Sequence, residues 1–175
     1  MKKMKLFRQM LAWSLVLLST ANAFAQVPAN DNCSGATNIN SLFGGPIGTV
    51  LLDGPYNNNN ATATAGLAVP DCFPTFAAAG EPALDNDLWF SFTGDGNTYF
   101  IETSDCNGTL TGTQYIDDGD TQIQIYEGTC GGLTPSANGC NEDGPNATDL
   151  LYPAGLTFQT EVGVTYYLLI DGFGG

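Results

Sequence analysis

Short runs of alternating apolar and polar residues dominate the chain, and they predict β-strands rather than helices. The clearest run is 87–92, which puts Leu88, Phe90 and Phe92 on one face of a strand and Trp89 on the other. Helical periodicity lasts no longer than a turn or two, because Gly, Asn, Thr, Ser, Asp and Pro recur throughout. The pattern therefore predicts an all-β protein.

Two pairs of neighbouring runs are expected to form antiparallel pairs. Residues 98–103 follow 87–92 across Gly94-Asp95-Gly96-Asn97, a composition typical of a hairpin turn. The runs 156–160 and 164–170 form the last pair. Because 164–170 is apolar on both faces, we expect it to be a central strand of its sheet.

The run 121–126 also alternates. It predicts that Ile123 and Ile125 point inward, whereas Gln122 and Gln124 point to solvent. Two sheets packed face to face are the economical way to bury such strands, so the sequence predicts an antiparallel β-sandwich.

The strand signals divide the chain into a loop-rich first part, 26–86, and a strand-rich core, 87–175. In the first part, 49–52 predicts a weak early strand, and 56–86 forms one long excursion. The chain stops at a Gly-rich turn composition, 171–175, with no strand after it. We expect that the last strand of the sandwich is missing and that the sequence is the N-terminal part of a longer protein.

The N-terminus predicts export. All four basic residues of the chain lie in its first eight positions, before the apolar run 11–18 and the small-residue motif Ala23-Phe24-Ala25. This order is typical of a secretory signal peptide, residues 1–25. The apolar run is shorter than the roughly 20 residues that span a bilayer. Cleavage near Ala25 would leave residues 26–175 as one domain that is secreted or held at the cell surface.

The charges of this mature chain exclude several classes of function. It has 18 Asp and Glu and no Lys, Arg or His, so it cannot neutralise the phosphates of nucleic acid, and an anionic membrane surface repels it. Nucleophilic sites that use His and metal sites ligated by His are impossible. Two carboxylates could in principle hydrolyse a glycoside, but chance alone brings some pair together among 18. We therefore predict that the chain is not an enzyme.

Five cysteines predict disulfides, because an exported chain meets an oxidising compartment. We favour Cys130 paired with Cys140, which closes a short loop, and Cys33 paired with Cys72. Cys106 is then unpaired, or paired outside this chain. The sequence does not choose among the pairings. A zinc site is the alternative, disfavoured because no Cys-x-x-Cys spacing occurs.

Acidic clusters on predicted turns are candidate calcium ligands, because no basic side chain relieves the repulsion between these carboxylates. Calcium prefers oxygen ligands from carboxylates, Asn and backbone carbonyls. The candidate acids are Asp85, Asp87, Asp117, Asp118, Asp120, Glu142, Asp143 and Asp171. The alternative is that they are solvated residues favoured by turn geometry, or that high external salt screens their charges.

Three tyrosines in predicted loops, Tyr56, Tyr115 and Tyr152, are candidates for contact with a ligand such as a sugar. Trp89 and Tyr167 lie inside predicted strands, where packing is the expected role.

Several motifs follow one another in an order that is typical of one family. They are Asn30-Asp31-Asn32-Cys33-Ser34-Gly35-Ala36, Asn60-Ala61-Thr62, Asp87-Leu88-Trp89-Phe90-Ser91-Phe92, the segment 120–133, Cys140-Asn141-Glu142-Asp143 and the segment 163–172. Together they resemble the pre-peptidase C-terminal-like β-sandwich modules of secreted bacterial proteins. The resemblance covers most of residues 26–175.

The resemblance implies a non-catalytic sandwich of jelly-roll type. Such modules are attached to peptidases, other hydrolases or adhesin-like surface proteins exported by type IX secretion, and some bind calcium. Asp120 and Asp143 match the acidic positions of the family. The final Gly-x-Phe-x-Leu strand of the family is absent from this sequence, as is a type IX sorting signal.

Taken together, these features predict a calcium-stabilised, adhesin-like extracellular module that binds or spaces. Its expected partner is a polysaccharide or a protein at the cell surface. The alternatives are an accessory domain of a secreted peptidase or glycosidase whose catalytic part is not in this sequence, and a carbohydrate-binding module.

Overall fold

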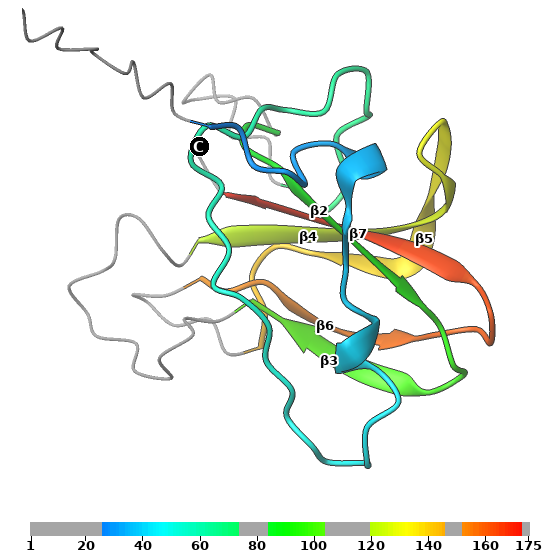
Figure 1. The fold of residues 1–175 in the computed structure, drawn as a ribbon. Coiled ribbons are helices and arrows are strands. Elements are labelled where there is room, and N and C mark those ends of the chain that lie inside the picture. The colour runs from blue at the N-terminus through cyan, green and yellow to red at the C-terminus, as the bar shows by residue number, and fades with distance from the viewer. Residues whose placement is uncertain (1–25, 74–83, 104–119, 146–151, 173–175) are drawn as a thin grey trace, which may run out of the picture.

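The computed structural model describes residues 26–73, 84–103, 120–145 and 152–172 (Figure 1). Within these ranges the chain is built of strands, with only two single-turn 3₁₀ helices, which confirms the all-β prediction. The elements are η1 (Cys33–Gly35), β1 (Thr37–Asn38), η2 (Asn40–Leu42), β2 (Leu88–Thr93), β3 (Thr98–Glu102), β4 (Thr121–Thr129), β5 (Gly132–Asn141), β6 (Gly155–Gln159) and β7 (Thr165–Gly172). The predicted signal peptide lies outside the described residues.

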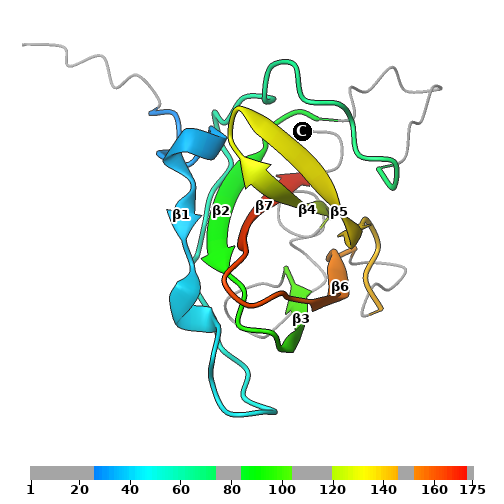
Figure 2. The same ribbon diagram turned by 90° about the vertical axis from the view of Figure 1, so that its right-hand side faces the viewer.

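The strands form two sheets that lie one over the other (Figure 2). The larger sheet has the order β1-β2-β7-β4-β5, and the smaller one pairs β3 with β6. All neighbouring strands are antiparallel except β1 and β2, which are parallel. Because β7 lies between β2 and β4, the predicted central position of 164–170 is confirmed.

Neither of the two predicted strand pairs forms. The connection from β2 to β3 and the connection from β6 to β7 both cross from one sheet to the other, so that β2 pairs with β7 and β3 with β6. The two connections lie side by side, because the Gly94 amide donates to the Val164 carbonyl at 2.8 Å and the Gly163 amide to the Gly94 carbonyl at 2.8 Å. A side chain at Gly94 would collide with the backbone of Glu161.

The first core lies between the two sheets. Ile123 and Ile125 are fully buried there, as predicted. The segment before β2 completes the cover: the Phe43 ring stacks on Phe92 with a centroid distance of 4.2 Å. The buried members of this core are Ile39, Ala61, Leu88, Phe90, Phe92, Ile123, Ile125, Ala154, Leu156, Phe158, Tyr166 and Leu168.

A second core covers the opposite face of the five-stranded sheet. It contains Trp89, Tyr126 and Leu169 from the strands, with Cys33, Phe73 and Leu84 from loops and turns. Gln122 and Gln124 share this face and are 3% and 2% exposed, so the prediction that they point to solvent is wrong. The alternation in this strand is typical of a half-exposed strand. It does not reveal the cover on the second face, because the covering residues come from distant loops.

The predicted strand at 49–52 is also wrong. No sheet pairing involves these residues, and Ile47, Val50 and Leu52 are largely exposed. Residues 46–52 instead form a loop that projects from the molecule, hereafter the 46–52 loop (Figure 1).

Two disulfides join the loops to the large sheet, with partners that differ from the predicted ones. Cys33 pairs with Cys130 and Cys72 with Cys140, at Cα–Cα distances of 5.5 and 5.9 Å. A Cys130–Cys140 bond does not form, because Cys130 precedes β5 and Cys140 lies near its far end, and each strand residue between them rises about 3.3 Å. Bonded cysteines need Cα atoms within about 7 Å. Cys106 lies outside the described residues.

Replacing Cys33 and Cys130 together by Ser, in a Cys106→Ser background that prevents thiol exchange, is expected to destabilise the fold. The bond closes a sequence separation of 97 residues, so the chain-entropy model predicts a loss of about 4.7 kcal/mol. Urea unfolding measures the loss. Peptide mapping without reductant provides the check, since a cross-link between Cys130 and Cys140 would contradict the described pairing.

Candidate metal centre

Three acidic side chains meet where β4 begins and β5 ends. Asp120 directly precedes β4, and Glu142 and Asp143 directly follow β5. The two strands are antiparallel, with Ile123 opposite Asn141 as the outermost register pair at this end, so the flanking residues lie side by side. One carboxylate oxygen from each acid lies within 4.8 Å of the others.

Backbone and amide contacts hold the Glu142–Asp143 turn against the start of β6. The Asn141 side chain donates to the Asp143 carbonyl at 3.2 Å and accepts from the Gly155 amide at 2.9 Å. The Gly144 amide donates to the Pro153 carbonyl at 2.9 Å. A side chain at Gly144 would lie 2.6 Å from the Gly155 nitrogen, so this close approach requires glycine.

Thr121 holds the other side of the centre. Its amide donates to the Tyr152 carbonyl at 3.1 Å, and its hydroxyl accepts from the Ala154 amide at 3.0 Å. The hydroxyl also lies 2.6 Å from that of Thr103, at the end of β3. The carboxylates are therefore positioned by a backbone framework rather than by one flexible loop.

The charges of this centre are not balanced. Burial, and then the negative charge of Asp143, raise the pKa of Asp120 to about 6. Burial raises the pKa of Glu142 too, and Asp143 and Asp120 add to the effect. The Asp120 Oδ1 atom is buried and accepts no hydrogen bond. All three observations describe carboxylates whose ionised forms are destabilised in the absence of a cation.

The donor atoms of the centre suit a hard cation. Carboxylate oxygens of Asp120, Glu142 and Asp143 are the ligands that calcium and magnesium prefer, and calcium takes six to eight oxygens in flexible geometry. Neighbouring carbonyls and water would complete such a shell. Zinc is a poor fit, because its sites use His or Cys and the described cysteines are all in disulfides.

Asp171, another predicted ligand, does not belong to this group. It lies on β7 and is 2% exposed. Its carboxylate accepts hydrogen bonds from the backbone amides of Asp85 and Asn86, the shorter ones at 3.2 and 2.9 Å. Burial, together with the charges of Asp87 and Asp85, raises its pKa to about 6 despite those bonds. Asp171 therefore holds the residues that enter β2.

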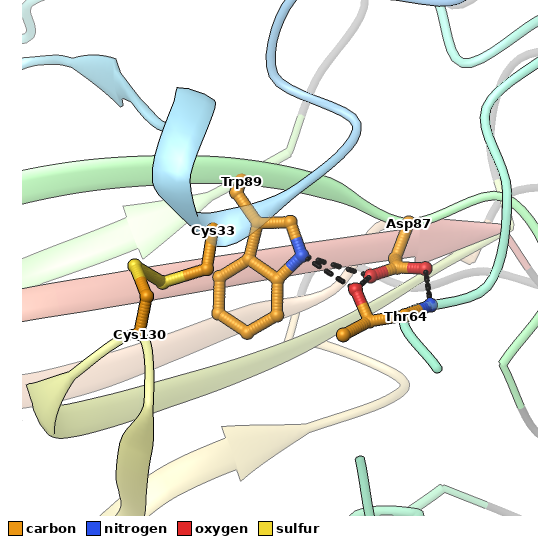
Figure 3. The surroundings of a disulfide bond; sticks show 5 residues. All are labelled: Cys33, Thr64, Asp87, Trp89 and Cys130. Carbon is orange, nitrogen blue, oxygen red and sulfur yellow. Dashed lines mark hydrogen bonds between the residues drawn. A yellow bond between two sulfur atoms is a disulfide. The ribbon is translucent and has the colours of Figure 1, made fainter. Parts of the chain in front are cut away.

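Asp87, from another predicted acidic turn, is completely buried beside Trp89. Its carboxylate accepts from the Thr64 amide at 2.8 Å, from the Thr64 hydroxyl and from the Trp89 indole at 2.9 Å. Figure 3 shows Trp89 between the Asp87–Thr64 pair and the Cys33–Cys130 disulfide. Burial raises the pKa of Asp87, and the bonds from Thr64 and Trp89 oppose that rise.

Asp31 is a second aspartate whose carboxylate accepts hydrogen bonds from a threonine. The strand and turn patterns did not predict this role. Its carboxylate accepts from the amide and the hydroxyl of Thr62. Thr62 and Thr64, two residues apart, thus donate hydrogen bonds to two different buried aspartates, Asp31 and Asp87. The sequence signals that could have indicated this contact are the alternation of threonines in the Ala/Thr stretch and the two motifs of the family resemblance that contain Asp31 and Thr62.

Two of the three candidate ligand-binding tyrosines lie in the described residues. Tyr56 is 42% exposed, but its ring packs edge-on against Phe90 and its hydroxyl donates to Asp53 at 2.8 Å. Tyr152 is half-buried beside the metal centre. Tyr115 lies outside the described residues, as do the predicted metal ligands Asp117 and Asp118.

Comparison with protein-family models, with curated proteins and with solved structures finds no match to this chain. Among the residues that the structure describes, no helix is long and apolar enough to cross a membrane.

The buried Asp171 gives a testable dependence on pH. Its pKa in the folded chain, about 6, is above its ordinary value of about 4, so the folded state binds the proton more tightly. Stability should therefore rise as the pH falls from about 6 to about 4. In Asp171→Asn, which keeps a carbonyl acceptor for the Asn86 amide, the rise in melting temperature over this range should be smaller.

Thermal unfolding with EDTA present measures this difference. Glu127→Gln is the matched control, because it removes one charge from an exposed position of β4. An equal pH dependence in Asp171→Asn and the unaltered chain would show that Asp171 does not titrate as described.

Proposed function

We propose that this chain is a non-catalytic extracellular module that binds or spaces at the cell surface and is stabilised by calcium. The observation that carries the proposal is the convergence of Asp120, Glu142 and Asp143 within 4.8 Å. In the mature chain no Lys, Arg or His could balance their charge. A bound divalent cation would balance it.

A calcium ion at this position would stabilise the fold, because its ligands flank different strands. Asp120 directly precedes β4, whereas Glu142 and Asp143 directly follow β5, and Asn141 connects this turn to β6. Binding to the folded state alone would shift the folding equilibrium by mass action. The ion would thus act as a structural clamp between the two sheets.

Export is supported by the cysteine chemistry as well as by the N-terminal sequence. Two disulfides are expected in an oxidising compartment and rare in the cytosol of most organisms. They fix loops that cover the second core. A module whose loops are fixed in this way suits a surface or secreted protein.

The jelly-roll interpretation rests on how the strands connect. Successive strands β2 and β3, and again β6 and β7, lie in opposite sheets, and each strand pairs with a member of the other couple. This kind of crossing between two antiparallel sheets is a property of jelly rolls. The family resemblance supports an adhesin-like role for the module.

Calcium should raise the melting temperature of residues 26–175 after EDTA treatment, at constant ionic strength. At a free calcium concentration one hundred times the dissociation constant, the expected gain is about 2.7 kcal/mol. The double variant Asp120→Asn with Asp143→Asn should lose most of this response. Differential scanning calorimetry measures it.

Glu127→Gln, which removes an exposed carboxylate from the same strand, is the control and should respond like the unaltered chain. Magnesium at equal ionic strength separates a selective site from charge screening. A melting temperature that does not respond to calcium, or that responds equally in the double variant, would refute the proposed site.

A further inference from the structure

One edge of the small sheet leaves its backbone groups exposed. The Thr103 amide donates to the Ala154 carbonyl and the Thr160 amide to the Asn97 carbonyl, both at 3.0 Å. These bonds lie at the two ends of the β3–β6 ladder, so the odd-numbered residues of β3 direct their amides and carbonyls at β6. The even-numbered residues direct theirs at the opposite, outer edge.

Thr98 and Phe100 present these groups at the edge. Within the described part of the chain, the edge-facing amides and carbonyls of these two residues have no backbone partner. Such a row of donors and acceptors is a template for another strand. We refer to it as the β3 edge.

The edges of the large sheet are protected. β5 carries Pro135, which cannot donate a hydrogen bond, and a bulge opposite Gln124 and Tyr126. β1 has only two residues. On β6 the edge-facing amide of Gly155 already donates to the Asn141 side chain, while Thr157 and Gln159 also face outward. The β3 edge differs from that edge in the exposed side chain of Phe100.

Apolar side chains lie near this edge. Phe100 is 50% exposed on the outer face of β3. The segment that leads into the 46–52 loop is fixed to the same strand, because the Phe43 ring packs edge-on against Tyr99 and the Gly44 amide donates to its hydroxyl at 2.9 Å. Both ribbon views place the loop and β3 at the same end of the molecule (Figures 1 and 2).

That loop adds further exposed apolar surface at this end. Ile47, Val50 and Leu52 expose 106%, 82% and 70% of their surface. Exposed apolar patches of this kind often mark interaction sites. Asp53 is the only charged residue between positions 32 and 70, so the segment that contains the loop is poor in charge. The acidic residues next to it along β3 are Asp95 and Glu102.

The size and charge of the edge indicate its occupant. A five-residue strand is too short to supply the roughly 1,000 Å² that a stable dimer interface buries. A second copy would also bring together two mature chains with 18 acidic and no basic side chains each. An extended peptide can bind without a large buried area and without bringing a second acidic chain close, because main-chain hydrogen bonds supply its affinity.

We propose that the β3 edge binds an extended, basic peptide segment of a partner protein by strand addition. In an antiparallel arrangement an apolar residue of the peptide would lie beside Phe100 on the outer face. Lys or Arg would lie toward Glu102 and toward Asp95, which is exposed at the start of the strand. The inference rests on the proposed role as a binding module and specifies the chemistry of its partner.

Amide hydrogen exchange measured by NMR tests the proposal. The probe is a synthetic peptide of alternating Val and Thr with Lys at both ends, added to the calcium-saturated protein. At saturation it should slow exchange at Thr98 and Phe100 by roughly tenfold or more. Tyr99 and Ile101, whose amides already bond to β6, should not change. A counterpart with Glu at both ends should bind more weakly, with a difference that shrinks in high salt.

Two controls make the result specific. Two further peptides carry N-methyl groups on alternate amides, one at the odd positions and one at the even positions. One of them should lose binding and the other should keep it, because only one set of amides meets the edge. Phe100→Ser should weaken binding by roughly tenfold, whereas Thr157→Ser, on the same outer face of β6, should not.

Three results would overturn the proposal. They are the absence of protection with the Lys peptide, slow exchange at Thr98 and Phe100 without peptide, and protection that grows with protein concentration alone, which would indicate a second copy. None of them depends on the calcium response of the melting temperature. The two proposals can therefore fail separately.

Discussion

The fold depends on how the described residues, which include no Lys, Arg or His, satisfy their buried carboxylates. Asp31, Asp87 and Asp171 are each 5% exposed or less, and residues 9–175 contain no Lys, Arg or His that could form an ion pair with them. Backbone amides, threonine hydroxyls and the Trp89 indole supply the hydrogen bonds instead. Because an unpaired buried charge costs several kcal/mol, these contacts determine where the loops must lie.

The consequence is that the loop-rich first part of the chain is a structural layer. Thr62 and Thr64 are hydrogen-bonded to buried aspartates, while Cys33 and Cys72 form disulfides with the β4–β5 hairpin. Together they cover Trp89 and the outer face of the large sheet. The acidic group at Asp120 differs from these carboxylates, since its buried oxygen has no donor. That contrast is the physical reason for assigning the cation to this group and not to Asp171.

Sequence patterns predicted what is local and failed where distant segments meet. Alternation in 87–92 and the apolar run 164–170 identified β2 and the central strand β7, and Ile123 and Ile125 were placed correctly. The pairing of strands and cysteines could not be predicted, because it depends on connections that cross between sheets. Gln122 and Gln124 look like solvent positions until the loops that cover them are placed. β5 was missed because Gly132, Pro135 and Gly139 interrupt its pattern.

The same limits apply to the candidate site. Asp120, Glu142 and Asp143 were among the predicted ligands, but local sequence could not show that the two ends of a hairpin unite them. The most direct test of the account is an NMR titration of the labelled protein with calcium. We predict shifts of backbone amides concentrated at 120–122 and 141–144, with little change at Asp31, Asp87 or Asp171. Shifts centred on those three aspartates, or none at all, would contradict the account.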